Sequence, residues 1–350
     1  MRPRPPILEA DRELLRAGTE PLREEFRGGR FFVTGGTGFF GCWILEALTA
    51  ANDAHGLGLS LTVLTRNMGA LRERAPHLAA HPAIHFLVGD VRTFPIPSER
   101  FEFVIHAAFD SSREPDEEET RSTIVDGTAR CLDLARRARA RRFLFVSSGA
   151  VYGKQPSDLS HIPEGYVDDP ASSESLSRYG KFKRAAEVLC LRTARETDLE
   201  VSIARGFAFV GPHLPLDAHF AVGNFLRDAL AGGPIRVHGD GTPIRSYLYA
   251  ADLAVWLLTI LFRGRSGDAY NLGSESEVSV GELAHFVADE IDPSLAVEIA
   301  RPASGTPPER YVPSNRKARA ELGLAETVML REAIRRTAAW YRNLPAAALH

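Results

Sequence analysis

Short apolar segments alternate with longer amphipathic segments along most of the chain. Each apolar segment has polar or glycine-containing neighbours and is predicted to be a strand. The predicted strands cover residues 30–34, 59–64, 84–88, 103–107, 143–147, 201–210 and 269–272. Residues 38–51 and 120–139 have the spacing of helices. Strands that alternate with helices form right-handed βαβ units around a buried parallel sheet, so the pattern predicts an α/β fold.

The remaining sequence predicts a second, smaller unit. A chain of 350 residues fits two domains, or one large domain with a lobe. We expect the large domain to comprise residues 30–211 and to be completed by residues 246–274. Residues 212–245, rich in Gly, Pro and His, and residues 275–345 are expected to form a C-terminal α/β lobe that binds substrate. Residues 1–29 precede both units.

This N-terminal extension, residues 1–29, has apolar side chains at roughly helical spacing between Ile7 and Phe26. It is predicted to be an amphipathic helix docked on the large domain, with a break near Gly18 or Pro21. An arm that binds a partner is the alternative.

The first predicted strand runs directly into the glycine-rich sequence Thr34–Gly41, which opens a helix. Gly35, Gly38 and Gly41 allow a tight turn, close approach of a pyrophosphate and packing of the helix against the strand. The pyrophosphate would lie at the helix N-terminus, where free N–H groups favour an anion. In this strand–loop–helix context, the motif predicts a dinucleotide site on a doubly wound parallel sheet of the Rossmann type. A plain glycine turn is the alternative.

The residues after the second predicted strand bear on the choice of cofactor. They read Leu64-Thr65-Arg66-Asn67 and include no carboxylate. An acid at this place would bind the ribose 2′-hydroxyl of NAD, whereas an arginine accommodates the 2′-phosphate of NADP. Arg66 therefore favours NADP over NAD. Asp90, after the third strand, is placed to contact the adenine.

Three residues suggest proton transfer. Tyr179 and Lys183 are four residues apart at the start of a predicted helix, so both lie on one face, and Ser148 ends a strand. A tyrosine with a pKa near 10 is a poor base at neutral pH. A nearby ammonium and an oxidised nicotinamide ring would both stabilise the phenolate and lower that pKa. The serine hydroxyl can share the proton and hold a substrate oxygen.

Together these motifs resemble the extended short-chain dehydrogenase/reductase family, the nucleotide-sugar epimerases and dehydratases, over about residues 30–340. The matching segments are Thr34–Gly41, Asp90-Val91, His106–Ala108, Ser147–Gly153, Tyr179–Lys183, Gly211-Pro212, Gly239–Gly241, Arg245–Asp252 and Tyr270–Gly273. The resemblance implies that Tyr179 is the catalytic base or acid, that Lys183 tunes it and holds the nicotinamide ribose, and that Ser148 completes the triad.

The resemblance also implies the binding residues. The expected cofactor site consists of Gly35, Thr37, Gly38, Phe39, Phe40, Gly41, Arg66, Asp90, Val91, Ala107, Ala108, Tyr179 and Lys183. Ser148 is expected to bind the sugar, and Asn224, Arg245 and Arg301 to contact the nucleotide diphosphate. Family members commonly pair through a helix bundle that includes the Tyr179–Lys183 helix, so we expect a homodimer.

Departures from the family pattern narrow the range of reactions that we expect the protein to catalyse. Family dehydratases carry an Asp-Glu pair directly after the catalytic Ser or Thr, and the sugar-acid decarboxylases also place an acid near there. Here the two positions are Gly149 and Ala150, which argues against both reactions. Asp110, Glu164 or Glu174 could supply an acid from a loop.

Two further departures affect the substrate pose, since Ala208 and Ile124 replace asparagines that the family usually has. What remains is redox chemistry at a sugar carbon, and we expect an NAD(P)-dependent nucleotide-sugar 4-epimerase. An NADPH-dependent reductase of nucleotide 4-keto sugars is the alternative, favoured by the missing acid after the second strand. A 4,6-dehydratase or decarboxylase ranks behind these, followed by a catalytically silent NADP-binding sensor.

Composition and charge exclude several other classes of protein. Lys and Arg number 42 against 45 Asp and Glu, so no global charge draws the chain to nucleic acid or an anionic membrane. Three widely spaced cysteines form no disulfide framework or zinc site, and His77, His81 and His85 are interrupted by prolines, so no metal is expected. With no signal peptide or long apolar run, we expect a cytoplasmic protein.

Overall fold

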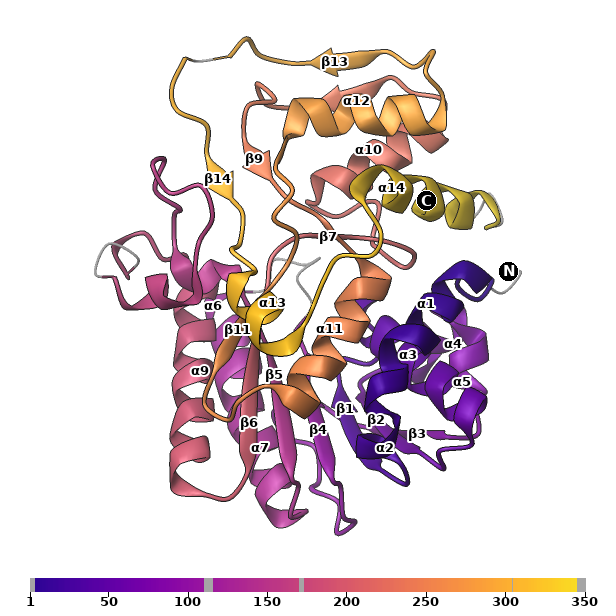
Figure 1. Ribbon diagram of the computed structural model, residues 1–350, viewed down its shortest axis with the longest axis vertical. Coiled ribbons are helices and arrows are strands. Elements are labelled where there is room, and N and C mark those ends of the chain that lie inside the picture. The colour runs from indigo at the N-terminus through magenta and orange to yellow at the C-terminus, as the bar shows by residue number, and fades with distance from the viewer. Residues whose placement is uncertain (1–3, 110–115, 170–172, 304, 345–350) are drawn as a thin grey trace.

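The central element is a seven-stranded parallel sheet (Figure 1). The structure, a computed structural model, describes residues 4–109, 116–169, 173–303 and 305–344. The sheet order is β11-β6-β5-β4-β1-β2-β3. Its strands are β1 (Arg30–Thr34), β2 (Ser60–Thr65), β3 (Ile84–Val88), β4 (Phe103–His106), β5 (Arg142–Ser148), β6 (Glu200–Gly206) and β11 (Ala269–Leu272). The order reverses between β1 and β4, the switch point at which such sheets bind ligands. The predicted Rossmann-type α/β fold is confirmed.

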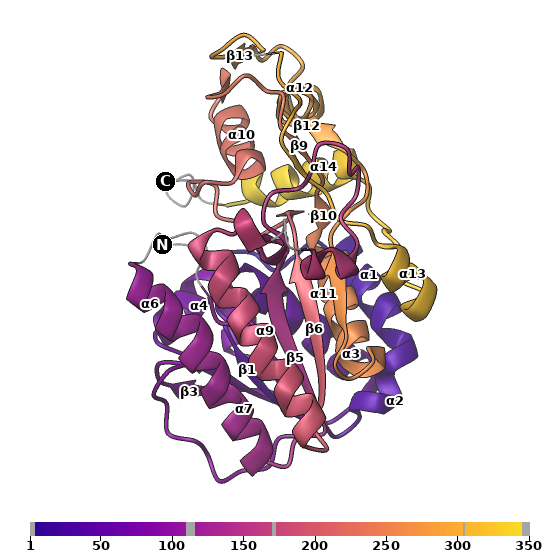
Figure 2. The same cartoon turned by 90° about the vertical axis from the view of Figure 1, so that its left-hand side faces the viewer.

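Helices cover both faces of this sheet (Figure 2). On one face lie α1 (Glu9–Thr19), α3 (Phe39–His55) and α11 (Ala250–Arg263). On the other lie α6 (Glu117–Arg121), α7 (Gly127–Arg137) and α9 (Arg178–Glu196). Within β1, Phe31 and Val33 pack in the first core and Phe32 in the second. A strand that is buried on both faces is apolar throughout, which explains the continuous apolar runs of the sequence. Two short helices, α4 (Met68–Arg74) and α5 (Pro76–Ala79), connect β2 to β3.

Two predicted elements differ in the structure. Residues 120–139 are not one helix, because a π-helical turn at Ser122–Asp126 separates α6 from α7. No Gly or Pro marks this turn, so periodicity alone did not reveal it. The predicted strand 201–210 is also wrong as a single strand. The chain leaves the sheet after Gly206, and β7 (Phe209–Val210) pairs instead with β10 (Leu248–Tyr249).

The smaller lobe lies beyond the carboxyl ends of the strands (Figure 1). It contains α10 (Ala221–Leu230), α12 (Val280–Ile291), α14 (Leu330–Arg342), the pair β8 (Ile235–Val237) and β13 (Val297–Ile299), and the sheet β12 (Val278–Ser279), β9 (Ile244–Arg245) and β14 (Arg310–Tyr311). Not all of residues 275–345 belong to it. Helix α13 (Arg316–Leu322) returns to the large domain, where Lys317 Nζ donates to the Ala269 carbonyl of β11 at 3.1 Å.

The N-terminal extension is docked on the molecule. It consists of α1, a 3-10 turn at Glu20–Leu22 that contains Pro21, and α2 (Arg23–Phe26). Asp11 is fully buried and accepts hydrogen bonds from Tyr249 Oη at 2.7 Å and Arg336 Nη1 at 2.9 Å. These partners come from β10 and from α14, so the extension contacts both the large domain and the lobe. Among the described helices, none is long and apolar enough to cross a membrane.

Candidate active site

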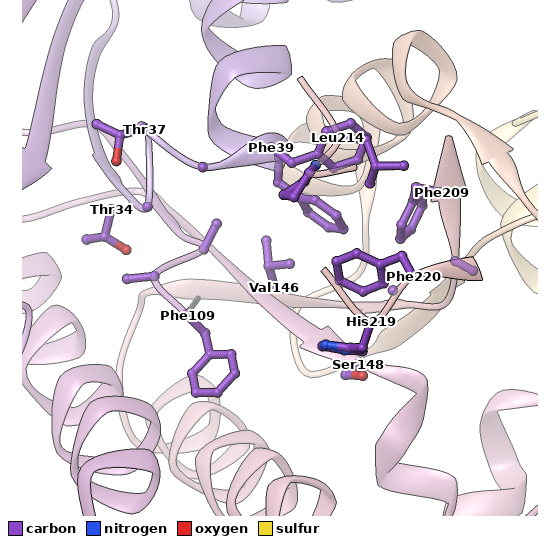
Figure 3. A pocket seen from close by; sticks show the side chains of 18 of the residues that line it. Thr34, Thr37, Phe39, Phe109, Val146, Ser148, Phe209, Leu214, His219 and Phe220 are labelled. Atoms are coloured by element: carbon purple, nitrogen blue, oxygen red, sulfur yellow. The ribbon is translucent and has the colours of Figure 1, made fainter. Parts of the chain in front are cut away.

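A large cavity opens at the carboxyl ends of the strands, between the sheet and the lobe. Its volume is about 1010 Å³, and its wall includes the glycine-rich loop, the ends of β2 to β5, the start of α9 and residues of the lobe. Figure 3 shows Thr37 toward one end of the cavity and Ser148 and Phe220 toward the other. The cavity therefore spans the sequence-predicted cofactor residues and the predicted catalytic residues.

The glycine-rich loop is packed too tightly for side chains at two of its positions. Gly35 has a φ of +73°, and a Cβ there would overlap the Ala107 carbonyl group at the end of β4. A Cβ at Gly41 would overlap the backbone of Gly35. Gly38 precedes the 17-residue helix α3 and lines the cavity, so the helix N-terminus faces the open space. This cradle fits a dinucleotide pyrophosphate.

Of the thirteen residues expected to bind the cofactor, only Gly41 is absent from the described cavity wall, since it packs α3 against the loop. Arg66 lines the cavity after β2, as does Asp90 after β3. The Asp90 carboxylate is paired with Arg92 at 2.7 Å, and this partner lowers the pKa of Asp90. Sequence reasoning did not identify Arg74, which also lines this end and donates from Nη1 to the Thr37 carbonyl at 2.9 Å.

The predicted catalytic residues lie on the same cavity wall. Ser177 caps α9 by accepting a hydrogen bond from the Gly180 amide at 3.1 Å. One turn of this helix separates Tyr179 from Lys183, whose Nζ donates to the Val146 carbonyl at 2.9 Å. Burial lowers the pKa of Lys183 to about 8. Burial raises the pKa of Tyr179, and the Ser148 hydroxyl opposes that shift by hydrogen bonding. The geometry can therefore pass a proton between a phenol, a hydroxyl and a substrate oxygen.

A buried polar network lies behind the catalytic residues. Glu187 follows Lys183 by one helical turn and forms an ion pair with Arg205 of β6. Ser147 Oγ donates to Glu187 at 2.5 Å, and Arg205 Nη1 donates to Tyr152 Oη at 2.9 Å. These bonds join α9 to the ends of β5 and β6, so they hold Lys183 in place.

The residues predicted to hold the nucleotide diphosphate are only partly brought together. Arg245 lines the cavity from β9. Asn224 and Arg301 are not part of the described wall. The Asn224 carboxamide accepts from Arg227 Nη1 at 3.2 Å within α10, and Arg301 is exposed in the segment after β13.

The loop carboxylates that could have replaced the family's missing acids do not line the cavity where they are described. Glu164 accepts from the Asn271 amide at 2.9 Å, and Glu174 is exposed. Asp110 lies outside the described residues. In the part of the wall that the structure describes, the acidic residues are Glu73 and Asp90, which belong to the cofactor end.

Sequence reasoning missed the aromatic part of the wall. It consists of Phe207 before β7, Phe209 in β7, Phe220 before α10, Tyr247 before β10 and Tyr311 in β14. They come from separate segments and form no sequence motif. Only the folded chain brings them to the wall that holds the predicted catalytic residues.

Comparison with known proteins identifies the family. Residues 31–273 match the model of the NAD dependent epimerase/dehydratase family. The chain is 32% identical to UDP-glucuronic acid decarboxylase 1 of Arabidopsis thaliana over 332 residues, which is 94% of this chain and 73% of the relative. It is 30% identical to UDP-glucuronic acid decarboxylase 3 of the same plant, covering 87% of this chain and 86% of the relative.

Solved structures of other proteins have the same fold as this chain. The structure resembles a dTDP-glucose 4,6-dehydratase from Streptomyces venezuelae with NAD bound, with a TM-score of 0.74, 25% identity and coverage of 92% of this chain and 100% of that one. It also resembles a UDP-glucose 4-epimerase from Thermotoga maritima with UDP-glucose, with a TM-score of 0.73, 22% identity and coverage of 89% and 98%. The chain thus belongs to the NAD-dependent epimerase/dehydratase family, and it is an enzyme of the extended short-chain dehydrogenase/reductase type, as its motifs predicted.

Proposed function

We propose that the protein removes the carboxylate of a nucleotide-linked uronic acid, by oxidising the sugar at C4 and reducing it again after CO2 has left. The proposal rests on the observation that Tyr179, Ser148 and Lys183 share one cavity wall with the cationic Arg245. The UDP-glucuronic acid decarboxylases among the relatives support this reaction over the 4-epimerisation that the sequence led us to expect.

Tyr179 would begin the reaction as the base that takes the proton of the C4 hydroxyl. The buried Lys183 ammonium would stabilise the phenolate, and Ser148 would hold the C4 oxygen. A bound nicotinamide dinucleotide would accept the C4 hydride and return it at the end of the cycle. The glycine-rich loop and Arg66 would hold its pyrophosphate and adenosine ribose, and Arg66 leads us to propose NADP over NAD.

Oxidation at C4 makes the C5 carboxylate labile. The C4 ketone lies β to that carboxylate, so the C5–carboxylate bond can break and its electron pair can enter the ketone as an enolate. Ser148 and the Tyr179 hydroxyl would hold the enolate oxygen. Arg245 would hold an anionic group of the substrate, because guanidinium pairs with carboxylate and phosphate alike.

The test is incubation of the purified protein with UDP-glucuronate and either NAD or NADP, followed by NMR of the sugar and by measurement of released CO2. We expect a nucleotide pentose and an equal amount of CO2, both lost in Tyr179→Phe. Absence of CO2 with every nucleotide uronic acid tried would reject the proposal.

A specific observation favours 4-epimerisation as the second candidate. Gly149 and Ala150 carry no acid, and the described carboxylates of the wall lie at the cofactor end. Epimerisation at C4 needs only proton exchange between Tyr179 and the substrate oxygen, hydride exchange with a bound nicotinamide, and rotation of the ketose between the two half-reactions. Interconversion of UDP-glucose and UDP-galactose without added reduced cofactor would establish it, whereas strict dependence on NADPH would indicate the 4-keto reductase instead.

A further inference from the structure

Tyr311 fills the space that a side chain at position 149 would occupy. A Cβ built on Gly149 would lie 2.6 Å from the Tyr311 phenol oxygen and 2.9 Å from the ring of Phe207. Real side chains do not approach so closely, so residue 149 must be glycine while Tyr311 is in place. Position 149, one of the two at which the family resemblance led us to expect an acid, is thus covered by a phenol from a distant part of the chain.

Ser148 shares the cavity wall with two phenols, those of Tyr179 and Tyr311. Tyr179 reaches it from α9 and Tyr311 from β14, and the Ser148 hydroxyl lowers the pKa of both by hydrogen bonding. All three side chains line the cavity. A substrate oxygen held by Ser148 and Tyr179 would therefore have Tyr311 beside a neighbouring carbon.

The surroundings of Tyr311 suit a proton donor. Its ring packs on Phe207, with centroids 4.6 Å apart. Burial raises the pKa of Tyr311 to about 12, so the phenol keeps its proton at neutral pH. Strand β14 pairs in parallel with β9 and places Tyr311 opposite Arg245, whose positive charge favours the phenolate. The cation would therefore stabilise the conjugate base after proton transfer.

We propose that Tyr311 is the acid that protonates C5 after CO2 has left, in place of the carboxylic acid missing at positions 149 and 150. This assignment rests on the proposed decarboxylation. Loss of CO2 leaves the electron pair of the broken bond in the enolate. That pair forms the new C5–H bond with the proton of the Tyr311 hydroxyl while the C4 ketone re-forms. The Tyr311 phenolate then takes a proton from water, so no further reagent is consumed.

The experiment compares the wild type with Tyr311→Phe on UDP-glucuronate in D2O. In the wild type, we expect one deuterium in a single stereochemical position at C5 of the product. In Tyr311→Phe, turnover should fall about 100-fold, the usual share of a general acid. The residual product should be a mixture of the two C5 stereoisomers, each with one deuterium, since water then protonates a poorly shielded enolate from either side. Oxidation at C4 in a single turnover should be retained, because Tyr179, Ser148 and Lys183 are unchanged.

Two controls keep the outcomes distinct. Tyr166→Phe removes a phenol from a residue outside the described cavity wall and should match the wild type, and thermal unfolding should show both variants folded. If wild-type protein releases no CO2, the proposed function fails and the Tyr311 role fails with it. If the wild type releases CO2 and Tyr311→Phe has wild-type turnover and one deuterium position, the Tyr311 role alone is rejected. Loss of the single-turnover oxidation in a folded variant would also reject it, because Tyr311 would then serve the first half-reaction.

Discussion

Glu187 and Arg205 form a buried two-point ion pair, in which Arg205 Nε and Nη2 lie 3.1 and 2.8 Å from the two carboxylate oxygens. The two residues are only 4% and 5% exposed. They join the helix of Tyr179 and Lys183 to the strand that runs beside Ser148. A stable position for the predicted catalytic residues thus depends on charges that lie outside the described cavity wall.

Removal of one partner of this ion pair should lower the free energy of unfolding substantially. Glu187→Gln leaves the Arg205 guanidinium buried without its counter-charge, so we expect a loss of about 3–5 kcal/mol in the free energy of unfolding. Urea denaturation measures this loss. The exposed pair between Asp133 and Arg137 provides the control, because Asp133→Asn should cost less than about 1 kcal/mol. Equal losses in the two variants would contradict the structural role of the buried pair.

Lys183 should make stability depend on pH. Burial lowers the pKa of Lys183 from 10.5 to about 8, so between these values the unfolded chain holds a proton that the folded chain has released. Stability contributed by this residue therefore rises with pH across that window and is lowest below it, where the charged ammonium is buried. Relative to Lys183→Met, the wild type should gain roughly 3 kcal/mol between pH 8 and 10.5 in urea unfolding.

The exposed Lys181 on the same helix is the matched control, and Lys181→Met should follow the wild-type pH profile. Parallel profiles for the wild type and Lys183→Met would show that the Lys183 pKa is not lowered.

Arg66 should discriminate between the two cofactors. Arg66→Ala removes a cation from the end of β2, and we expect the dissociation constant for NADP to rise about tenfold while that for NAD stays unchanged. Fluorescence titration of the purified protein measures both constants. Arg72→Ala, an exposed change on α4 outside the described cavity wall, should alter neither. An equal effect of Arg66→Ala on NAD and NADP would refute a phosphate-binding role.

The contact between Gly149 and Tyr311 gives a test by double substitution. In Gly149→Ala the new methyl group must displace the phenol, and we expect turnover to fall at least about tenfold. In the Tyr311→Phe background the phenol oxygen is already gone, so the same change should have a smaller effect. Gly165→Ala meets no atom within 4 Å and should be neutral. If Gly149→Ala lowers turnover by the same factor in the wild type and in Tyr311→Phe, the two positions are independent.

The parts of the fold and of the candidate site that depend on local sequence patterns could be predicted. The glycine loop, the strand-ending Ser148 and the Tyr179–Lys183 spacing are each encoded within a few neighbouring residues, and the structure brings them to one cavity. The contact of Tyr311 with Gly149 could not be predicted, because it joins residues 162 positions apart through the pairing of β14 with β9. Asn224 is not part of the described cavity wall for a related reason, because the direction of its side chain depends on how α10 packs.

The burial of Asp11 sets an order of events during synthesis. Its partners, Tyr249 and Arg336, follow it by 238 and 325 residues. A ribosome must therefore have translated residue 336 before the extension can complete both bonds. The apolar face with Leu15 and Phe26 depends on earlier residues, because it packs with α3 and with α11, where Phe26 contacts Phe262. The extension can thus pack on α3 and α11 before Arg336 is made, so only the ion pair of its buried carboxylate waits for the late part of the chain.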